Sequence, residues 1–161
     1  MKKECSESEV RIKAEAYCSV AERCRSEVAQ KLWQWGAPAE AEASILKHLE
    51  AENYVDENRY AIAFVRDKYR FSQWGRIKII HALRMKHISE SDIKEGLEHI
   101  DEEEYLSILN DLLSRKKRTV KASNDYERNG KLIRFAASHG YELDDILSCL
   151  KQQGCGDEYM E

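Results

Sequence analysis

The sequence repeats itself three times at intervals of just over fifty residues, and this period limits the fold more than any other feature. Gly36, His87 and Gly140 lie 51 and 53 residues apart. Counted from each of these three residues, apolar residues recur at positions −8, −7, −4, +1 and +10, and no gap is needed in the alignment. In that order they are Val28/Ile79/Leu132, Ala29/Ile80/Ile133, Leu32/Leu83/Ala136, Ala37/Ile88/Tyr141 and Leu46/Leu97/Leu150. Amphipathic helices produce apolar matches by chance, but the matched terminators favour a true repeat.

The spacing around each terminator predicts two helices in every copy. The positions before the terminator share one helix face. Glycine adopts the left-handed C-cap conformation freely, and histidine interacts well with a helix C-terminus. A second helix then starts at Pro38 in the first copy, at Ser89 with Asp92 in the second, and at Glu142 in the third.

A further helix is predicted ahead of each pair. In the first copy Val10, Ala14, Tyr17 and Ala21 are spaced at about 3.6 residues. In the second copy Asp56 caps a helix over residues 57–70, with Tyr60, Phe64 and Val65 facing inward. In the third copy Asp101 and Glu104 form a capping box ahead of a leucine-rich helix, and residues 118–129 form a loop.

We therefore predict an all-α fold of three tandem three-helix repeats, at residues 1–53, 54–100 and 101–161, the last with a short C-terminal tail. One repeat is too small to bury its apolar face alone, so the repeats are expected to stack into an elongated, curved body. The single proline and seven glycines are too few turn residues for a β-sandwich or barrel.

The cysteines and the termini indicate a cytoplasmic protein. The five cysteines form no C-x-x-C pair, which argues against zinc, and their odd number fits a reducing compartment. Cys18 and Cys24 sit in helical pattern and are expected to be small core residues. No signal peptide follows Met1, and the longest apolar run, residues 61–65, is too short to cross a membrane.

Motifs of catalysis are missing from the sequence. The glycines form no phosphate-binding loop, no serine lies in a nucleophile elbow, and the five histidines form no metal-hydrolase pair. The acidic residues fall at helix starts and outer faces, where capping and solvation account for them. We therefore expect a protein that is not an enzyme and that needs no cofactor or metal.

Charge alternates along the chain in blocks of about twenty residues, with the third predicted helix of each repeat acidic and the central helices and the long loop basic. The whole sequence has a net charge of −4, but residues 37–58, 66–86, 88–104, 115–134 and 142–161 carry −5, +6, −7, +6 and −5. In a stacked array, equivalent helices align, so the charges would gather into stripes able to dock a patterned surface or a polyanion. The alternative is an ordinary solvated helix face, and we favour binding.

Five aromatic residues lie near predicted helix ends or loops, and they have two interpretations. They are Trp33, Trp35, Tyr69, Phe71 and Trp74. Stacking on nucleobases is one role for such residues. Packing between repeats is the interpretation we favour.

Several segments resemble motifs of the RecX family, regulators of the RecA recombinase, over about residues 10 to 152. The segments are residues 53–61 with 64–66, residues 74–78 with Leu83, residues 131–136 with Gly140, Tyr141 and Ile146, and, loosely, residues 25–28 with Leu32. Asn53 stands in place of the usual glycine and tolerates the left-handed conformation. His87 also replaces a glycine, and Gly130 stands where a basic residue is common.

The resemblance implies a monomeric crescent that binds along the groove of the RecA filament on single-stranded DNA. There it would interfere with strand exchange, with filament growth and with repressor self-cleavage in the SOS response. It also implies a weak direct contact with single- or double-stranded DNA. The basic residues expected to face the filament, with Arg76 and Arg134 foremost, are Arg66, Arg70, Arg76, Lys78, Arg84, Lys86, Lys116, Lys117, Arg118, Lys121, Lys131 and Arg134.

Two other functions remain open from the sequence. In one, a three-helix unit acts like a helix-turn-helix and binds DNA without RecA, with an affinity that falls steeply as salt rises. The acidic helices argue against sequence-specific insertion into a groove. In the other, the chain is a plain helical scaffold for another protein.

Overall fold

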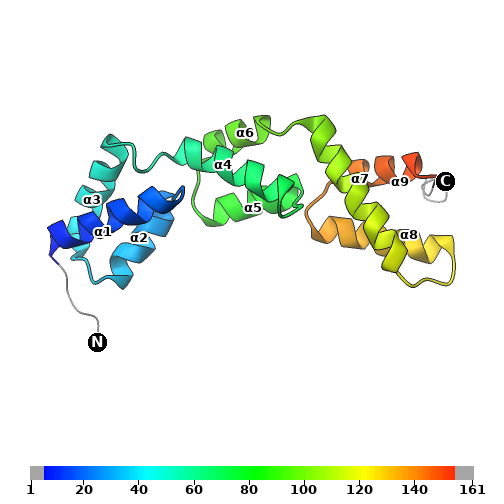
Figure 1. The fold of residues 1–161 in the computed structure, drawn as a ribbon, viewed down its shortest axis with the longest axis horizontal. Coiled ribbons are helices and arrows are strands. Elements are labelled where there is room, and N and C mark those ends of the chain that lie inside the picture. Colours follow the sequence, from blue (N-terminus) through cyan, green and yellow to red (C-terminus); the bar gives the residue numbers. More distant parts are fainter. Residues whose placement is uncertain (1–5, 155–161) are drawn as a thin grey trace. The chain divides into compact units, whose positions relative to one another are not determined.

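Helices account for about three quarters of the part of the chain that is described, residues 6–154. A computed structural model contains nine α-helices and no strand within these residues (Figure 1). In chain order the helices are α1 (Glu7–Val20), α2 (Arg25–Gln34), α3 (Ala39–Ala51), α4 (Glu57–Arg70), α5 (Arg76–Met85), α6 (Glu90–Glu98), α7 (Glu102–Thr119), α8 (Asp125–Ser138) and α9 (Leu143–Gln152). The predicted all-α repeat fold, with three helices per repeat, is confirmed.

The three predicted terminators end α2, α5 and α8 with the same hydrogen bonds. Gly36, His87 and Gly140 have φ angles of 76°, 62° and 96°. In each case the next residue donates its N–H to the carbonyl four residues before the terminator, at 2.9, 3.1 and 3.3 Å. This is the Schellman arrangement, in which a left-handed residue closes the helix. Asn53, with φ 62°, is left-handed after α3, as expected.

The helix starts also follow the predicted caps. Carboxylate oxygens of Asp56 and Asp101 each accept a hydrogen bond at 3.0 Å from the backbone N–H three residues later. The Ser89 hydroxyl accepts one from the Asp92 N–H at 3.2 Å. These side chains satisfy N–H groups that have no partner within the helix, so the start of each helix is fixed locally.

Replacing Asp101 with alanine is expected to lower the free energy of unfolding by about 1 kcal/mol, because the first turn of α7 would lose its cap. Urea denaturation followed by circular dichroism would measure the change. Ser107, exposed in the same helix, provides the matched control. Its replacement with alanine should change stability by less than about 0.5 kcal/mol, and equal effects for the two variants would contradict the capping role.

Two details of the predicted helices are wrong. The loop expected at residues 118–129 spans only residues 120–124, because the Asn124 side chain accepts from the Glu127 N–H at 2.8 Å and starts α8 early. Ala21, expected on the inner face of the first helix, is its exposed C-cap. Cys18 is buried in the core as expected, whereas Cys24 is a buried N-cap rather than a residue within a helix.

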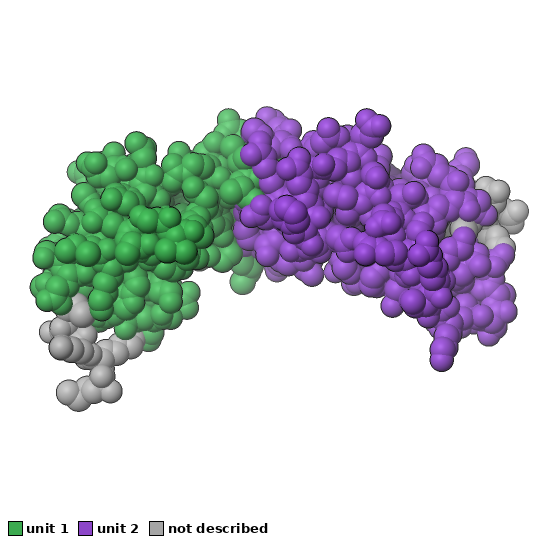
Figure 2. All heavy atoms as spheres, viewed as in Figure 1, with its two compact units in different colours: residues 1–63, 83–96 green, residues 64–82, 97–161 purple. Residues whose placement is uncertain are grey.

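The chain divides into two compact units, shown in green and purple in Figure 2. Unit 1 contains residues 1–63 and 83–96, and unit 2 contains residues 64–82 and 97–161. The division passes through α4, α5 and α6. The second group of three helices therefore contributes residues to both units, and the repeat boundaries near residues 53 and 100 stay predictions.

Unit 1 has an aliphatic core drawn mainly from α1, α2 and α3. Its buried members are Val10, Ala14, Cys18, Val28, Leu32, Ala41, Ile45, Leu46, Leu49 and Val55. Tyr17 and Trp35 pack at its margin, edge to face, with ring centroids 6.1 Å apart. Burying these side chains supplies most of the stability of the unit.

Unit 2 has a core that includes three neighbouring tyrosines. The ring centroids of Tyr69 and Tyr105 are 6.4 Å apart, and those of Tyr105 and Tyr141 are 5.2 Å apart. All three residues are buried. The Tyr105 hydroxyl accepts from the Arg76 N–H at 3.0 Å and donates to Glu142 Oε1 at 2.8 Å. Burial raises the pKa of Tyr105 well above its ordinary value, so it stays a neutral donor.

Each unit contains a contact, which we call a junction, between two helices that are each the second of their group of three. The start of α2 contacts the end of α5 in unit 1, and the start of α5 contacts the end of α8 in unit 2. In unit 1 the Ser26 hydroxyl donates to the Lys86 carbonyl at 2.8 Å. In unit 2 the Ile77 N–H donates to the Gly140 carbonyl at 3.0 Å and Gly75 donates to the His139 carbonyl at 2.7 Å. Ser26 and Ile77 both lie ten residues before a terminator, so the two junctions are equivalent in the repeat.

Candidate partner-binding surfaces

Several basic side chains expected to bind a partner instead form ion pairs within their own unit. Arg70 pairs with Glu104 at 2.8 Å, Arg84 with Glu90 at 2.7 Å, Lys86 with Glu27 at 3.1 Å, Lys131 with Glu127 at 3.3 Å, and Arg76 with three carboxylates. The other four cations are more exposed than Arg76, so their pairs contribute little stability, but they partly neutralise the cation.

Arg76 is the most enclosed of these cations. Its guanidinium donates to Glu102, donates to Glu142 Oε2 at 3.2 Å and lies 3.8 Å from Asp145. It also lies 4.2 Å from the centroid of the Tyr105 ring. Its side chain is only 23% exposed. These contacts give Arg76 a structural role inside unit 2 that competes with the predicted partner contact.

Arg25 makes the corresponding contacts in unit 1. Arg25 and Arg76 are the first residues of α2 and α5, and both lie eleven residues before a terminator. The Arg25 N–H donates to Glu57 at 3.3 Å, and its guanidinium pairs with Glu50 at 2.5 Å. Glu57 and Glu102 are in turn the first residues of α4 and α7. The first residue of α2 and of α5 therefore contacts the glutamate that begins α4 or α7, Arg25 through its main-chain N–H and Arg76 through its guanidinium.

A second group of basic residues in unit 2 keeps its charge available. Its members are exposed, and none forms an ion pair with another described residue; they are Arg66, Arg118, Lys121 and Arg134. Lys116 lies 4.7 Å from the Phe135 ring and Lys78 lies 4.6 Å from the Trp74 ring. Lys117, the remaining predicted contact, is half-buried in α7. The two residues favoured most by the sequence therefore have different environments. Arg134 is exposed, whereas Arg76 is held by carboxylates of its own unit.

Trp74 lies in a small cluster of aromatic and basic side chains in unit 2. The ammonium groups of Lys68 and Lys78 are each 4.6 Å from its ring centroid, and Phe64 meets it edge to face at 6.2 Å. Such cation–π contacts contribute roughly 0.5–1 kcal/mol at exposed sites. The ring is half-buried, so packing explains it in part.

The interpretation that the aromatic residues pack inside the fold holds for two of the other four and fails for two. Tyr69 is fully buried, and Trp35 is half-buried against Tyr17. Trp33 and Phe71 are 68% and 81% exposed, so the expected packing is wrong for both. Sequence alone could not separate these cases, because all five lie near helix ends.

Unit 1 contains an acidic hollow where α3, α4 and α6 approach one another. It is lined by Glu50, Asn53, Val55, Asp56, Glu57, Asn58 and Asp92. Burial raises the pKa of Glu57, against the lowering effect of Arg25. Within residues 6–154, no group of three or more histidine, cysteine or acidic side chains is arranged to hold a metal ion.

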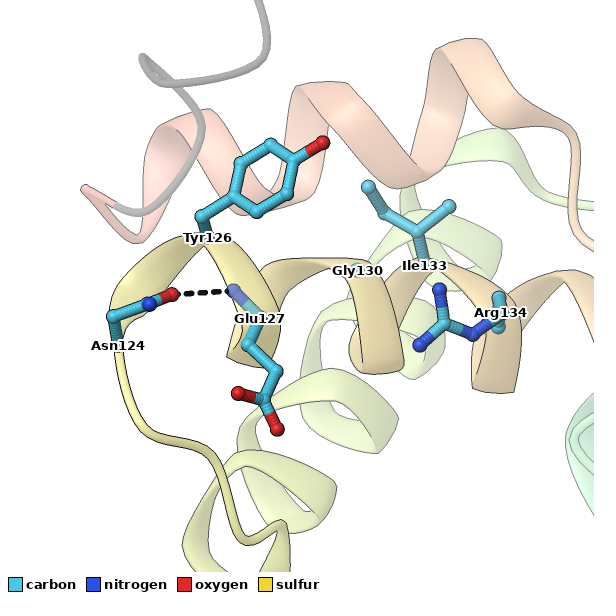
Figure 3. Close-up of a pocket in the computed structure, with 6 residues that line it drawn as sticks. All are labelled: Asn124, Tyr126, Glu127, Gly130, Ile133 and Arg134. Carbon is cyan, nitrogen blue, oxygen red and sulfur yellow. Dashed lines mark hydrogen bonds between the residues drawn. The ribbon is translucent and has the colours of Figure 1, made fainter.

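The surface of α8 carries a second hollow, which the sequence did not single out. Its volume is about 530 Å³, and Figure 3 shows the residues that line it: Asn124, Tyr126, Glu127, Gly130, Ile133 and Arg134. Tyr126 and Ile133 project from the same side of the helix as the gap at Gly130 (Figure 3). The signal available in the sequence was a glycine inside a helix, flanked at i−4 and i+3 by large side chains.

The fold defines an all-α protein built from groups of three helices. Residues 56–97 match the family model for the second three-helix domain of RecX, and residues 102–150 match the model for its third. The chain belongs to the RecX family of regulatory proteins, as the sequence motifs suggested. Across residues 6–154, no helix has the length and apolar character needed to span a bilayer.

Individual relatives agree with this assignment. The regulatory protein RecX of Clostridium perfringens (strain 13 / Type A) is 30% identical over 159 residues, covering 98% of this chain and 71% of the relative. That of Pelodictyon phaeoclathratiforme is 25% identical over 127 residues, covering 79% and 78%. The crystal structure of RecX from Lactobacillus salivarius has a TM-score of 0.79 at 19% identity, covering 92% of this chain and 96% of that one. That structure supports the fold alone.

Proposed function

We propose that this chain regulates the RecA recombinase by binding along the groove of the RecA–DNA filament. There it would limit strand exchange, filament growth and co-protease activity. Membership of the RecX family supports RecA as the partner. The observation that carries the proposal is the set of exposed basic residues in unit 2 that form no ion pair with another residue in the described part of the chain, namely Arg66, Arg118, Lys121 and Arg134.

The mechanism proposed is steric and electrostatic. A chain bound in the groove would hinder both filament extension and entry of a second DNA. The exposed basic residues would face the acidic surface of the filament or its DNA. The acidic helices beside them would fix the orientation of docking, because complementary charge steers encounter and disfavours wrong registers.

The direct test adds the purified protein to RecA on single-stranded DNA and follows ATP hydrolysis and strand exchange. Inhibition of both reactions is expected when the protein is equimolar with RecA. Unchanged rates at that concentration would overturn the proposal.

Reversing the charge at both Arg66 and Arg134, with R66E and R134E together, is expected to weaken this inhibition at least tenfold. The docking surface would change by four units of charge, whereas neither residue forms an ion pair with any residue among 6–154 that would support the fold. The measurement is the protein concentration that halves the rate of strand exchange.

The matched control reverses Lys47 and Lys94, which are exposed lysines in the acidic parts of unit 1. This pair changes the net charge by the same amount and should leave the inhibition within about twofold. If both double variants inhibit equally, and circular dichroism shows both folded, the docking surface lies elsewhere.

Direct DNA binding without RecA is the second candidate, and the cluster of Lys68, Trp74 and Lys78 favours it. Such a cluster can hold a phosphate and a base at once. Binding to duplex or single-stranded DNA alone, with an affinity that falls steeply between about 50 and 200 mM salt, would support this function. Absence of such binding would leave RecA as the target.

A further inference from the structure

Gly130 lies inside α8, and the backbone conformation there does not require a glycine. Gly36 and Gly140 have positive φ angles, whereas Gly130 is not among the residues with positive φ. A glycine in a helix interior destabilises the helix by roughly 0.5–1 kcal/mol relative to alanine. The missing side chain does, however, open the α8 hollow, which Gly130 lines together with Tyr126 and Ile133.

The α8 hollow combines two large side chains, those of Tyr126 and Ile133, with one available cation. Tyr126 is 67% exposed, and Ile133 lies on the same face of the helix (Figure 3). Arg134 is exposed and forms no ion pair with a described residue. The Glu127 carboxylate is already bound by Lys131 at 3.3 Å and by the Ser123 N–H at 3.3 Å. The hydrogen bond from Ser123 contributes most to lowering its pKa, so Glu127 stays charged.

We propose that the α8 hollow receives one large apolar side chain from an acidic segment of the protein partner, whose neighbouring carboxylate binds Arg134. This inference rests on the proposed function and specifies one of its contacts. A guanidinium binds a carboxylate through two parallel hydrogen bonds. An aromatic or aliphatic anchor in a pocket of this size is the usual centre of a protein–protein contact.

The lining favours a peptide over a nucleic acid. Arg134 is the single cation among the six lining residues, and the carboxylate among them, that of Glu127, is already paired with Lys131. Nucleic acids gain their affinity by neutralising several phosphates at once. A single arginine beside Tyr126 and Ile133 therefore suits one carboxylate next to an apolar anchor residue better than a chain of phosphates.

The experiment titrates the ¹⁵N-labelled full chain with a synthetic peptide, Asp-Glu-Trp-Asp-Glu-Glu, and follows the backbone amides by NMR. Two further probes are the same peptide with alanine for tryptophan and a dT20 oligonucleotide. The protein variants are Gly130→Leu, which fills the hollow, and Arg134→Gln, which removes its cation. The control, Ala137→Leu, adds the same bulk at an exposed position of α8 outside the hollow.

The tryptophan peptide is expected to shift the amides of Tyr126, Gly130 and Ile133 and to bind at least fivefold more tightly than its alanine analogue. Gly130→Leu should abolish binding, Arg134→Gln should weaken it at least fivefold, and Ala137→Leu should leave it unchanged. Leucine is a better helix former than glycine, so the filled variant should fold at least as stably as the natural chain.

Three results would overturn the proposal: equal binding of the two peptides, undiminished binding to Gly130→Leu, or shifts at these amides with dT20 but not with the peptide. The assay contains no RecA, so its failure leaves the proposed function standing. Conversely, peptide binding together with unchanged strand exchange would remove the proposed function alone.

Discussion

Replacing Arg76 with alanine is expected to lower the free energy of unfolding by about 2–4 kcal/mol. Removing one partner of a buried ion pair typically costs about 3–5 kcal/mol, because the opposite charges stay behind unpaired. Arg76 is 23% exposed and leaves carboxylates at Glu102, Glu142 and Asp145 that water can partly reach, so its expected value is about 1 kcal/mol lower than that range. The midpoint of urea denaturation at pH 7 measures the loss.

Arg66 provides the control for this substitution. It lies in the same unit, is exposed, and forms no ion pair with a described residue. Its replacement with alanine should change stability by less than about 0.5 kcal/mol. Similar losses for the two variants would show that the carboxylate cluster does not depend on Arg76.

The loss in free energy of unfolding caused by Arg76→Ala should also become smaller as the pH falls. Burial and the carboxylates of Glu142 and Glu102 raise the pKa of Asp145, whereas Arg76 lowers it. Without Arg76 the folded-state pKa rises further above the unfolded value of about 3.9. The native state then binds protons more strongly than the unfolded state, so its stability increases as the pH falls from 7 toward about 5. A stability loss that stays constant over this pH range would show that Arg76 does not control the pKa of Asp145.

Replacing Gly75 with alanine is expected to destabilise the protein by about 3 kcal/mol. A Cβ atom at this position would lie 2.3 Å from both the Gly140 carbonyl carbon and the Tyr141 nitrogen. Both are backbone atoms, so the clash cannot be relieved by rotating a side chain. Overpacking of this kind costs about 1–3 kcal/mol, and here it would also strain the 2.7 Å bond from Gly75 to His139.

Gly130→Ala is the matched control for this prediction. The chemical change is the same, but Gly130 lines an open hollow in a helix, so alanine should stabilise the protein by about 0.5–1 kcal/mol. Thermal and urea unfolding would compare the two variants. A loss below about 1 kcal/mol for Gly75→Ala would mean that α5 can move away from the end of α8 at little cost.

Much of the fold could be predicted from the sequence because its signals are local. The residues at 36, 87 and 140 were assigned as terminators from spacing alone, and all three have positive φ. Caps at Asp56 and Asp101 act on N–H groups three residues away. The end of the loop before α8 was misplaced because Asn124 was interpreted as part of a loop, whereas it caps a helix that begins at Asp125.

The candidate site was less predictable because it depends on partners far apart in the chain. Arg76 lies in a basic block and inside a family motif, and both features favour an exposed role. Its carboxylate partners Glu142 and Glu102 lie 66 and 26 residues away, and only folding brings them together. The α8 hollow was missed for the opposite reason, since it results from a side chain that is absent.

The two junctions have a consequence for the order of the repeats. The junction in unit 1 is made by the Ser26 hydroxyl, which donates to the Lys86 carbonyl, and by the ion pair between the Lys86 ammonium and the Glu27 carboxylate. The junction in unit 2 is made by main-chain groups at Gly75 and Gly140 that tolerate no added carbon. We therefore expect each second helix to fit its own neighbour better than that of another repeat. Exchanging or duplicating repeats would place unlike junction halves against each other, so the stability of such a rearranged chain should fall below that of the natural order.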